Sequence, residues 1–253
     1  MKKITAISAF ILICVMLFTS CSFLGSVNDA LFGPDYEKIT NNIFTKYIEM
    51  NVSVITVHKS RVKEYESHGS GVIYAEDNRY YYLLTNAHVI ESDSEFPQTI
   101  YTIYDCYANE YNATLIHSDP SYDLAVLRIV KGSEPLCVVA FAENDAKKGT
   151  KVVTLGTSNG LINSVTYGEI QNYDTVELHD KNGNVDNRVS FPVVWHSAPM
   201  WGGGSGSVLL NMDMELVGIN FAVATDNSGA FIYGFAISAT KVHEYLKNNN
   251  LVK

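Results

Sequence analysis

Thr85-Asn86-Ala87-His88-Val89 begins at the last residue of an apolar run, residues 80–85. That run has the length and composition of a buried β-strand. Two further segments lie downstream, and with the first one they are called the three islands. They are residues 119–127, which contain Asp123, and Gly202-Gly203-Gly204-Ser205-Gly206-Ser207. A histidine, an aspartate and a glycine-flanked serine are the three parts of an activated serine nucleophile. Their order along the chain excludes the α/β-hydrolase arrangement, in which the serine comes first. The three islands therefore predict a chemistry and restrict the fold that carries it.

Each island supplies one role in that chemistry. Ser205 is the predicted nucleophile, and His88 is the predicted base, because a neutral imidazole can take the hydroxyl proton during attack. Asp123 is predicted to fix the tautomer of the ring and to stabilise the imidazolium. The backbone N–H groups of Gly203 and Ser205 are the predicted oxyanion-hole donors, since glycine permits the backbone conformation that this needs.

No cofactor and no metal are expected. None of the seven histidines lies in an H-E-x-x-H motif, and the four cysteines lack the spacing of a zinc site. The histidines other than His88 are interpreted as surface or packing residues. They are His58, His68, His117, His179, His196 and His243.

Most of the chain after residue 50 consists of short runs rich in Val, Ile, Tyr and Thr. Many short strands at this spacing predict an all-β barrel or sandwich rather than a βαβ sheet. Apolar residues at helical spacing between Asp35 and Met50 predict an amphipathic helix that packs on the domain or binds a partner, and residues 241–247 predict a closing helix. Examples of the predicted strands are residues 52–58, 71–74, 80–85, 99–104, 124–130, 151–155, 189–194, 207–210 and 216–222.

Together with four further segments, the islands resemble the trypsin-like serine peptidases of the HtrA type over residues 50–245. The resemblance implies a chymotrypsin-like fold of two six-stranded antiparallel β-barrels, to which the residue pattern adds a short N-terminal helix and a C-terminal helix. It also implies that His88 and Asp123 come from the first barrel and Ser205 from the second. The further segments are Gly69-Ser70-Gly71-Val72-Ile73, Val152-Val153-Thr154-Leu155-Gly156, Val217-Gly218-Ile219-Asn220 and Gly234-Phe235-Ala236-Ile237.

The loop around the nucleophile departs from the usual G-N-S-G-G pattern of this family. Gly204 replaces the asparagine, Ser207 replaces the last glycine, and the bulky Trp201 precedes the loop. Serine at the last position also occurs in relatives of the glutamyl endopeptidases, so it does not exclude activity. No PDZ domain is recognised, and a PDZ-regulated or chaperone-like role is not expected.

The resemblance also suggests the primary substrate pocket. Met200, Asn220 and Ala222 fall where the family lines that pocket, and Pro199 falls near the position at which trypsin-type enzymes place a carboxylate. Without that acid, a buried Lys or Arg side chain of the substrate would lack a charge partner. The prediction is cleavage after small or medium apolar residues.

The first residues read as an export signal. Lys2 and Lys3 precede an apolar run, and Thr19-Ser20-Cys21 follows it. A cysteine after small residues resembles the lipobox of bacterial lipoproteins, so Cys21 is a predicted lipid-attachment site; an ordinary secretory signal is the alternative. The predicted organisation is 1–20 signal peptide, 21–34 tether, 35–140 N-terminal helix and first β-barrel, and 141–253 second β-barrel and C-terminal helix.

Charge and cysteine content restrict the partners and the redox chemistry. The formal net charge of −9 becomes −11 when the two lysines of the signal are removed, and an acidic chain without a basic cluster argues against nucleic acid. Cys106 and Cys137 are the cysteines left for the folded domain, either as a disulfide or as two buried thiols.

Three functions fit the sequence. The leading hypothesis is an exported, lipid-anchored serine endopeptidase that acts on protein or peptide substrates. The first alternative is a catalytically inactive binding or sensing module that keeps the fold but holds a collapsed oxyanion loop. The second is an esterase-like hydrolase that uses the same three residues.

Overall fold

The computed structural model describes residues 34–92, 95–178, 185 and 189–252. By their internal contacts, the residues fall into two units, Met1–Ile43 and Phe44–Lys253. The predicted signal, Cys21 and the tether up to residue 33 lie outside the described residues. Within the described part of the chain, no helix is both long and apolar enough to cross a membrane.

The first unit contributes one helix, α3 (Tyr36–Asn42). Asp35 caps it, since its side chain accepts a hydrogen bond from the backbone N–H of Lys38 at 3.0 Å. The predicted helix between Asp35 and Met50 is helical over its length but changes type. A π-helical turn, η1 (Ile43–Tyr47), and a 3₁₀ turn, η2 (Ile48–Met50), follow α3.

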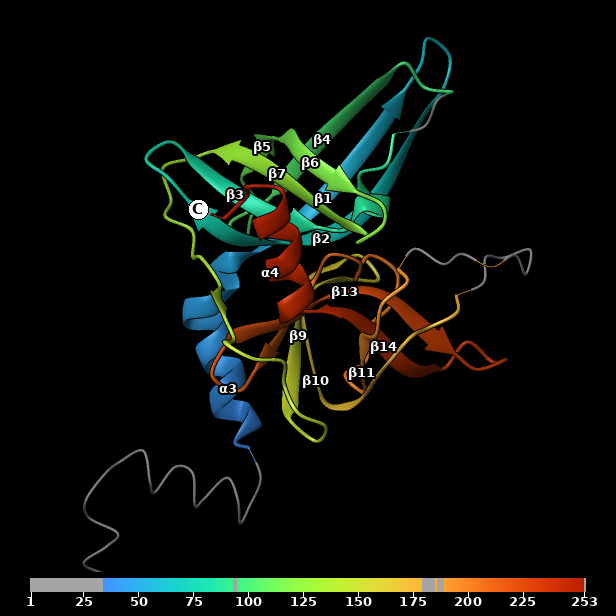
Figure 1. Ribbon diagram of the computed structural model, residues 1–253. Coiled ribbons are helices and arrows are strands. Elements are labelled where there is room, and N and C mark those ends of the chain that lie inside the picture. The colour runs from blue at the N-terminus through green and yellow to red at the C-terminus, as the bar shows by residue number, and fades with distance from the viewer. Residues whose placement is uncertain (1–33, 93–94, 179–184, 186–188, 253) are drawn as a thin grey trace, which may run out of the picture. The chain divides into compact units, whose positions relative to one another are not determined.

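The second unit is built from two β-sheets, each of seven strands. The first has the order β5-β4-β1-β2-β3-β7-β6, and the second β12-β9-β10-β11-β14-β13-β8. In the second sheet β12 also pairs with β13, which closes six strands into a ring and leaves β8 outside it. Figure 1 shows the two sheets one above the other, with the first in blue to green and the second in yellow to red.

The strands of the first sheet are β1 (Asn51–Lys59), β2 (Glu64–Glu76), β3 (Tyr80–Thr85), β4 (Gln98–Tyr104), β5 (Glu110–Asn112), β6 (Thr114–Asp119) and β7 (Leu124–Val130). Those of the second are β8 (Ala140–Phe141), β9 (Lys151–Ser158), β10 (Leu161–Asp174), β11 (Val193–His196), β12 (Val208–Asn211), β13 (Glu215–Thr225) and β14 (Phe231–Ser238). The remaining helices are the 3₁₀ turn η3 (Ala87–Val89) and α4 (Ala239–Asn248).

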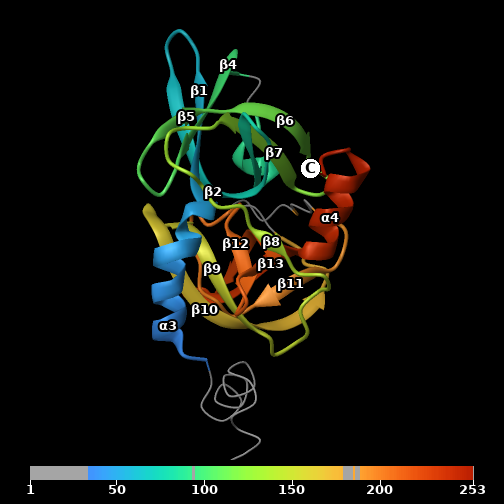
Figure 2. The ribbon, with the colours of Figure 1, turned by 90° about the vertical axis from the view of Figure 1, so that its left-hand side faces the viewer.

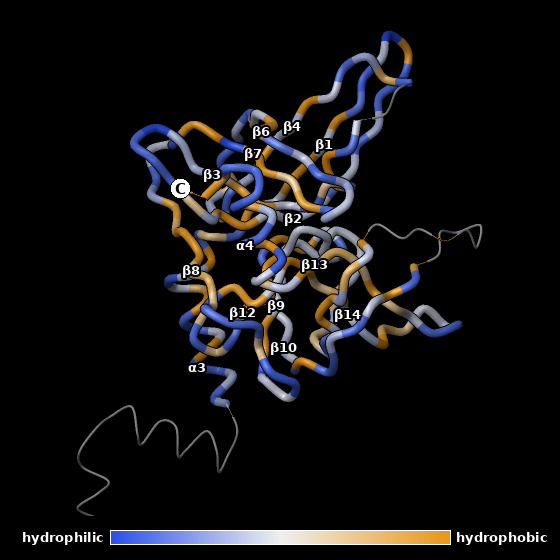
Figure 3. The backbone as a smooth tube through the Cα atoms, in the orientation of Figure 1, coloured by the Kyte–Doolittle hydropathy of each residue, from blue (hydrophilic) through white to orange (hydrophobic). Residues whose placement is uncertain are grey.

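Each sheet encloses its own apolar core. Val54, Leu83 and Leu127 are fully buried in the first, and Val152, Leu209 and Ala236 in the second. Figure 3 shows hydrophobic stretches within the strands of both sheets. Burying these side chains is the main source of stability for such a sheet pair.

Helix α4 links the two sheets, and Figure 2 shows it beside both of them. It contacts β13 and β14 of the second sheet. Tyr245, which is fully buried, lies with its hydroxyl 3.1 Å from Nδ1 of His117 in the first sheet. Beyond α4, the carbonyl of Leu251 accepts a hydrogen bond from the hydroxyl of Tyr74 on β2 at 3.0 Å. The predicted closing helix is therefore present and lies against both sheets.

The sheets confirm the all-β, two-barrel prediction and correct some of its details. Each sheet has a seventh, short strand beyond the expected six: β5, and β8, which pairs in parallel with β13. The strand predicted for residues 189–194 begins only at Val193. Pro192 precedes it, and proline has no N–H to donate to a strand pairing.

Cys106 and Cys137 are both free thiols and half-buried, so they form no disulfide in this structure. Burial, followed by the nearby charges of Asp105 and Glu49, raises the pKa of Cys106 to about 11. The pKa of Cys137 is also raised, mainly by burial. Both are therefore protonated near neutral pH.

Candidate active site

His88 and Asp123 are brought together by the pairing of two neighbouring strands. β3 ends at Thr85 and leads into η3, which carries His88, while Asp123 lies directly before β7. Because β3 and β7 are antiparallel, with Thr85 opposite Ala125, the end of one strand lies beside the start of the other. Asp123 is 1% exposed, so its carboxylate is held almost entirely by the protein.

Three contacts fix the imidazole against the carboxylate. Nδ1 of His88 lies 2.8 Å from Oδ2 and 3.0 Å from Oδ1 of Asp123, and the backbone N–H of His88 donates to Oδ1 at 3.0 Å. A carboxylate can only accept, so the neutral ring carries its proton on Nδ1. Nε2 is then left with its lone pair, as a base requires.

Asn86 holds the backbone that presents the carboxylate. Its side-chain amide donates to the carbonyl of Asp123 at 2.9 Å. Asp123 has a φ of +50°, in the left-handed region that is uncommon for residues other than glycine. Such backbone conformations persist where surrounding contacts impose them, and they gather at functional sites.

Ser205 lies in the loop between β11 and β12 and is half-buried. Its backbone carbonyl accepts a hydrogen bond from the N–H of Ser70 on β2 at 2.8 Å, so a direct bond joins the nucleophile loop to the first sheet. Its hydroxyl lies 3.4 Å from the carbonyl oxygen of Phe221. Within the described residues no hydrogen bond joins this hydroxyl to His88. The pair His88–Asp123 is thus assembled, whereas the hydroxyl of Ser205 is directed at the carbonyl of Phe221.

Gly206 shows why glycine follows the serine. It has a φ of +84°, and a Cβ atom there would lie 2.0 Å from the carbonyl oxygen of Ser70 and 2.5 Å from Oγ1 of Thr85. The loop therefore presses against the middle of β2 and the end of β3 so closely that no side chain fits. This contact brings Ser205 to the side of the first sheet that carries His88.

The two predicted oxyanion-hole amides are free to donate hydrogen bonds to a substrate oxygen. The carbonyl of Gly202 accepts from the N–H of Asn159 at 2.8 Å, and the carbonyl of Gly204 accepts from the N–H of Ser207 at 3.0 Å. In a trans peptide group the C=O and the N–H point in opposite directions. The bond to the carbonyl of Gly202 therefore turns the N–H of Gly203 away from Asn159. In the same way, the bond to the carbonyl of Gly204 turns the N–H of Ser205 away from Ser207. Among the described residues, the N–H groups of Gly203 and Ser205 have no acceptor.

A buried polar chain that the sequence did not reveal lies behind the nucleophile loop. Nε2 of His196 is 2.9 Å from Oδ1 of Asn220, whose side-chain nitrogen donates to Oγ of Ser207 at 2.9 Å. His196 is completely buried, and burial lowers its pKa to about 4, against the opposing effect of the bond to Asn220. His196 therefore stays neutral near pH 7. Ser207, which departs from the family pattern, has a defined partner in this chain.

The three predicted pocket residues have different surroundings. Met200 is buried and, with Gly204 and Ser207, lines a cavity of about 10 Å³. Both polar atoms of the Asn220 side chain are used in the buried chain, and Ala222 is half-buried. The assignment of these residues to the primary substrate pocket stays a prediction.

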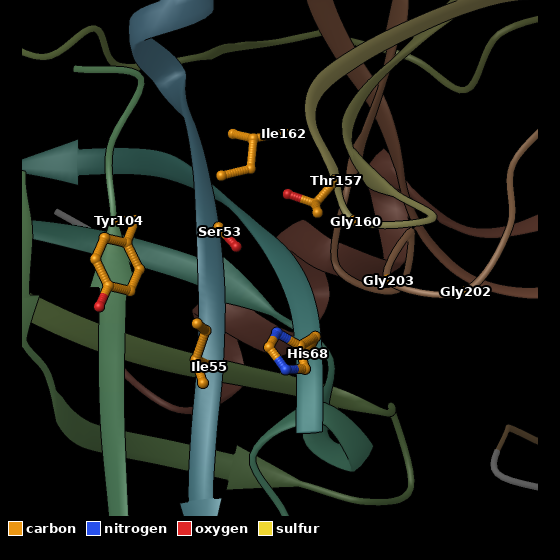
Figure 4. Close-up of a pocket in the computed structure, with 9 residues that line it drawn as sticks. All are labelled: Ser53, Ile55, His68, Tyr104, Thr157, Gly160, Ile162, Gly202 and Gly203. Carbon is orange, nitrogen blue, oxygen red and sulfur yellow. The ribbon is translucent and has the colours of Figure 1, made fainter. Parts of the chain in front are cut away.

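Two larger cavities adjoin the site. One, of about 680 Å³, includes His88, Asp123, Pro120 and Tyr101 in its lining. The other, of about 590 Å³, reaches the nucleophile loop at Gly202 and Gly203. Figure 4 shows the second one between the strands that carry Ser53, Ile55, His68 and Tyr104 and the segments that carry Thr157, Gly160, Ile162, Gly202 and Gly203. Open space thus extends from both the histidine and the oxyanion side.

The family model of the trypsin-like peptidase domain matches residues 69–219. A probable periplasmic serine endoprotease, DegP-like, of Halomonas elongata is 32% identical over 193 residues, which cover 75% of this chain and 37% of that protein. The serine protease Do-like HtrA of Bacillus subtilis is 34% identical over 178 residues, 69% of this chain and 37% of that protein. The chain thus spans only about a third of the length of these curated relatives.

Among solved structures, the active form of the Rv3671c protease from M. tuberculosis is similar to this chain, with a TM-score of 0.67 and 25% sequence identity. The similarity covers 87% of this chain and 89% of that protein. The inactive form of the same protease gives a TM-score of 0.62.

Proposed function

Because this chain belongs to the trypsin-like peptidase family, we propose that it is a serine endopeptidase of the HtrA type that uses Ser205, His88 and Asp123. The observation that carries this proposal is the pair of unpartnered amides, Gly203 and Ser205, on the loop that holds the serine. In a collapsed loop, a backbone carbonyl would take the place of one of these free N–H groups. The resting geometry therefore favours the enzyme over the inactive binding module.

The reaction follows from the placement of protons. His88 holds its Nδ1 proton on Asp123, so Nε2 can take the proton of the Ser205 hydroxyl as Oγ bonds to the substrate carbonyl carbon. The negative charge that develops on the carbonyl oxygen is stabilised by the two free amides. The imidazolium then gives its proton to the leaving amine, the C–N bond breaks, and an acyl-enzyme remains. Water, activated by His88, cleaves the ester and restores Ser205.

Two cavities, one at His88 and one at the loop that carries Gly203, support a polypeptide substrate rather than a small ester. An extended chain needs space both before and after the bond that is cut, and the cavities of about 680 Å³ and 590 Å³ lie next to His88 and Gly203, respectively. A small ester would need only one of them. For the residue before the cleaved bond, the proposal remains a small or medium apolar side chain, near Met200, Asn220 and Ala222.

Export is part of the same proposal. The relatives that carry the match include proteins named periplasmic, and residues 1–20 have the pattern of an export signal. We place the enzyme in the cell envelope, anchored by a lipid on Cys21. Metabolic labelling with a radioactive fatty acid tests the anchor. Label is expected on the full chain and not on the Cys21→Ala variant. A wild type without label would contradict the lipid anchor and favour an ordinary secretory signal.

Two substrates separate the enzyme classes. Purified protein is incubated with an unfolded protein labelled for fluorescence and, separately, with a short-chain ester, with Ser205→Ala as the matched control. The proposal predicts cleavage of the protein substrate that Ser205→Ala lacks. Ester hydrolysis without any cleavage of the protein would favour the esterase, and no serine-dependent turnover of either would favour the binding module.

A further inference from the structure

The four peptide groups that run from Gly202 to Gly206 alternate in how they are bonded. The group between Gly203 and Gly204 is bonded at both ends, as is the group between Ser205 and Gly206. In the other two, only the carbonyl is bonded, and the N–H belongs to a predicted oxyanion-hole donor. Each donor peptide is therefore flanked by a peptide whose orientation is fixed from both sides.

Ser70 supplies one bond to each of the fixed peptides. Its hydroxyl donates to the carbonyl of Gly203 at 2.9 Å, and its backbone N–H donates to the carbonyl of Ser205 at 2.8 Å. The opposite ends are held by two other carbonyls: that of Trp201, in the same loop, accepts from the N–H of Gly204, and that of Asn220, on β13, accepts from the N–H of Gly206. Ser70 is completely buried, so neither bond is weakened by exchange with water.

The hydroxyl proton of Ser70 is directed at Gly203 by a second contact. The backbone N–H of Thr157, on β9, donates to Oγ of Ser70 at 2.7 Å and occupies one of its acceptor positions. The alternative acceptor, the carbonyl of Thr157, is farther away, at 3.4 Å. The single proton of the hydroxyl therefore goes to the nearer oxygen.

We propose that Ser70 is a positioning residue that holds the oxyanion loop in its competent form, by clamping the Gly203–Gly204 peptide from the first sheet. This inference rests on the proposed function of the loop. Losing the hydroxyl would free the carbonyl of Gly203 and leave the N–H of Thr157 without a partner, so the peptide could rotate and carry the N–H of Gly203 with it. Ser70 touches no reacting atom, so it acts only through Gly203 and Ser205.

Ser70→Ala tests the clamp, and Tyr74→Phe is the matched control. Tyr74 lies on the same strand and also donates a buried hydroxyl to a carbonyl, but that carbonyl is Leu251, away from the loop. For Ser70→Ala we expect kcat on a peptide substrate to fall about 10- to 100-fold, somewhat less than the loss of a whole oxyanion donor, with KM little changed. The affinity for a peptide aldehyde, which forms an oxyanion on Ser205, should fall by a similar factor.

A crystal structure of Ser70→Ala supplies a readout that is independent of turnover, and the Gly203–Gly204 peptide is expected to be rotated in it. If Ser70→Ala does not fold, Ser70→Cys takes its place, because a thiol is a weaker donor of similar shape, and an intermediate kcat is expected.

The outcomes separate this inference from the proposed function. A wild type that hydrolyses nothing contradicts the proposed function, and the crystal structure then decides on the clamp alone. An active wild type whose Ser70 variants keep full kcat and aldehyde affinity overturns the clamp and leaves the proposed function standing. A loss of kcat of the same size in Tyr74→Phe would also overturn it, because the effect would then come from general destabilisation.

Discussion

His88 and Asp123 are joined by both side chain and backbone: the carboxylate lies 2.8 Å from Nδ1 of the ring and accepts the backbone N–H of His88 at 3.0 Å. The second bond keeps the carboxylate in place when the ring changes its charge. The orientation of the imidazole is therefore built into the first sheet.

Asp123→Asn should abolish most of the activity without unfolding the protein. An amide can donate to Nδ1, which would move the ring proton to Nε2 and remove the base. We expect kcat/KM to fall by about 10³- to 10⁴-fold, with thermal stability measured in parallel. Asp119→Asn is the matched control, since Asp119 lies in the same island and caps the turn at Ser121. A comparable loss of activity in that control would contradict the specific role of Asp123.

Gly206→Ala should destabilise the protein far more than Gly229→Ala. The two glycines have nearly the same φ, +84° and +83°, but a Cβ atom at Gly206 would strike Ser70 and Thr85, whereas nothing lies within 4 Å at Gly229. Backbone strain alone accounts for about 1–2 kcal/mol in each, and the collision adds to it at Gly206. Urea unfolding should give a loss of about 3 kcal/mol or more for Gly206→Ala. Equal losses would show that the loop does not press on β2 as described.

Acid should destabilise the protein through His196. Its pKa is lowered to about 4 in the fold, while the unfolded value is near 6.5, so below pH 6.5 the unfolded chain binds a proton that the folded one does not. The free energy of unfolding should therefore fall as the pH drops from about 6.5 to about 4, by an amount on the order of 3 kcal/mol.

His196→Gln isolates this contribution to the pH dependence. Carboxylates with lowered pKa values, such as Glu169 and Glu244, also lose stabilisation in acid and remain in the variant. The difference between the two pH profiles of the unfolding free energy should be confined to the range between about 4 and 6.5. Parallel profiles would mean that His196 has the same pKa in the folded protein as in the unfolded chain.

Ala222→Tyr should narrow the proposed primary pocket. If Ala222 lines it, kcat/KM for peptides with leucine before the cleaved bond should fall by about tenfold or more relative to peptides with alanine there. A peptide library compared between wild type and variant measures this ratio. An unchanged preference would remove Ala222 from the pocket, and efficient cleavage after Lys or Arg by the wild type would contradict the predicted specificity.

The parts of the fold that the sequence predicts best are those in which local pattern and tertiary contact agree. β3 and β7 coincide with the predicted residues 80–85 and 124–130, because both are central strands with continuous apolar runs. β10 is not among the example strands named from the sequence, because its side chains are mostly half-buried and show no clear alternation. Gly168 lies within that strand, where a Cβ atom would be 2.1 Å from the backbone nitrogen of Ala198. A strand interrupted by such a close approach carries little periodic signal.

At the site, the residues that perform chemistry were predictable, and those that support them were not. His88, Asp123 and Ser205 each stand in a recognisable island. Ser70 and Gly203 are 133 positions apart, and the sequence around neither residue indicates that they are in contact. His196, predicted to be a surface or packing residue, is wholly buried, and the sequence does not indicate its bond to Asn220. The contact of Ser70 with Gly203 arises only when the second sheet folds against the first, and the chain of His196 only when β11 and β13 come together within the second sheet.

The most direct test of the central claim is labelling with a fluorophosphonate, which bonds only to an activated serine. Intact mass and peptide mapping of the folded protein should show one adduct, on Ser205, that is absent from Ser205→Ala and strongly reduced in Asp123→Asn. A folded wild type that takes up no label between pH 6 and 9, or that takes it up on another serine, would contradict the assignment of Ser205 as the nucleophile of a working protease.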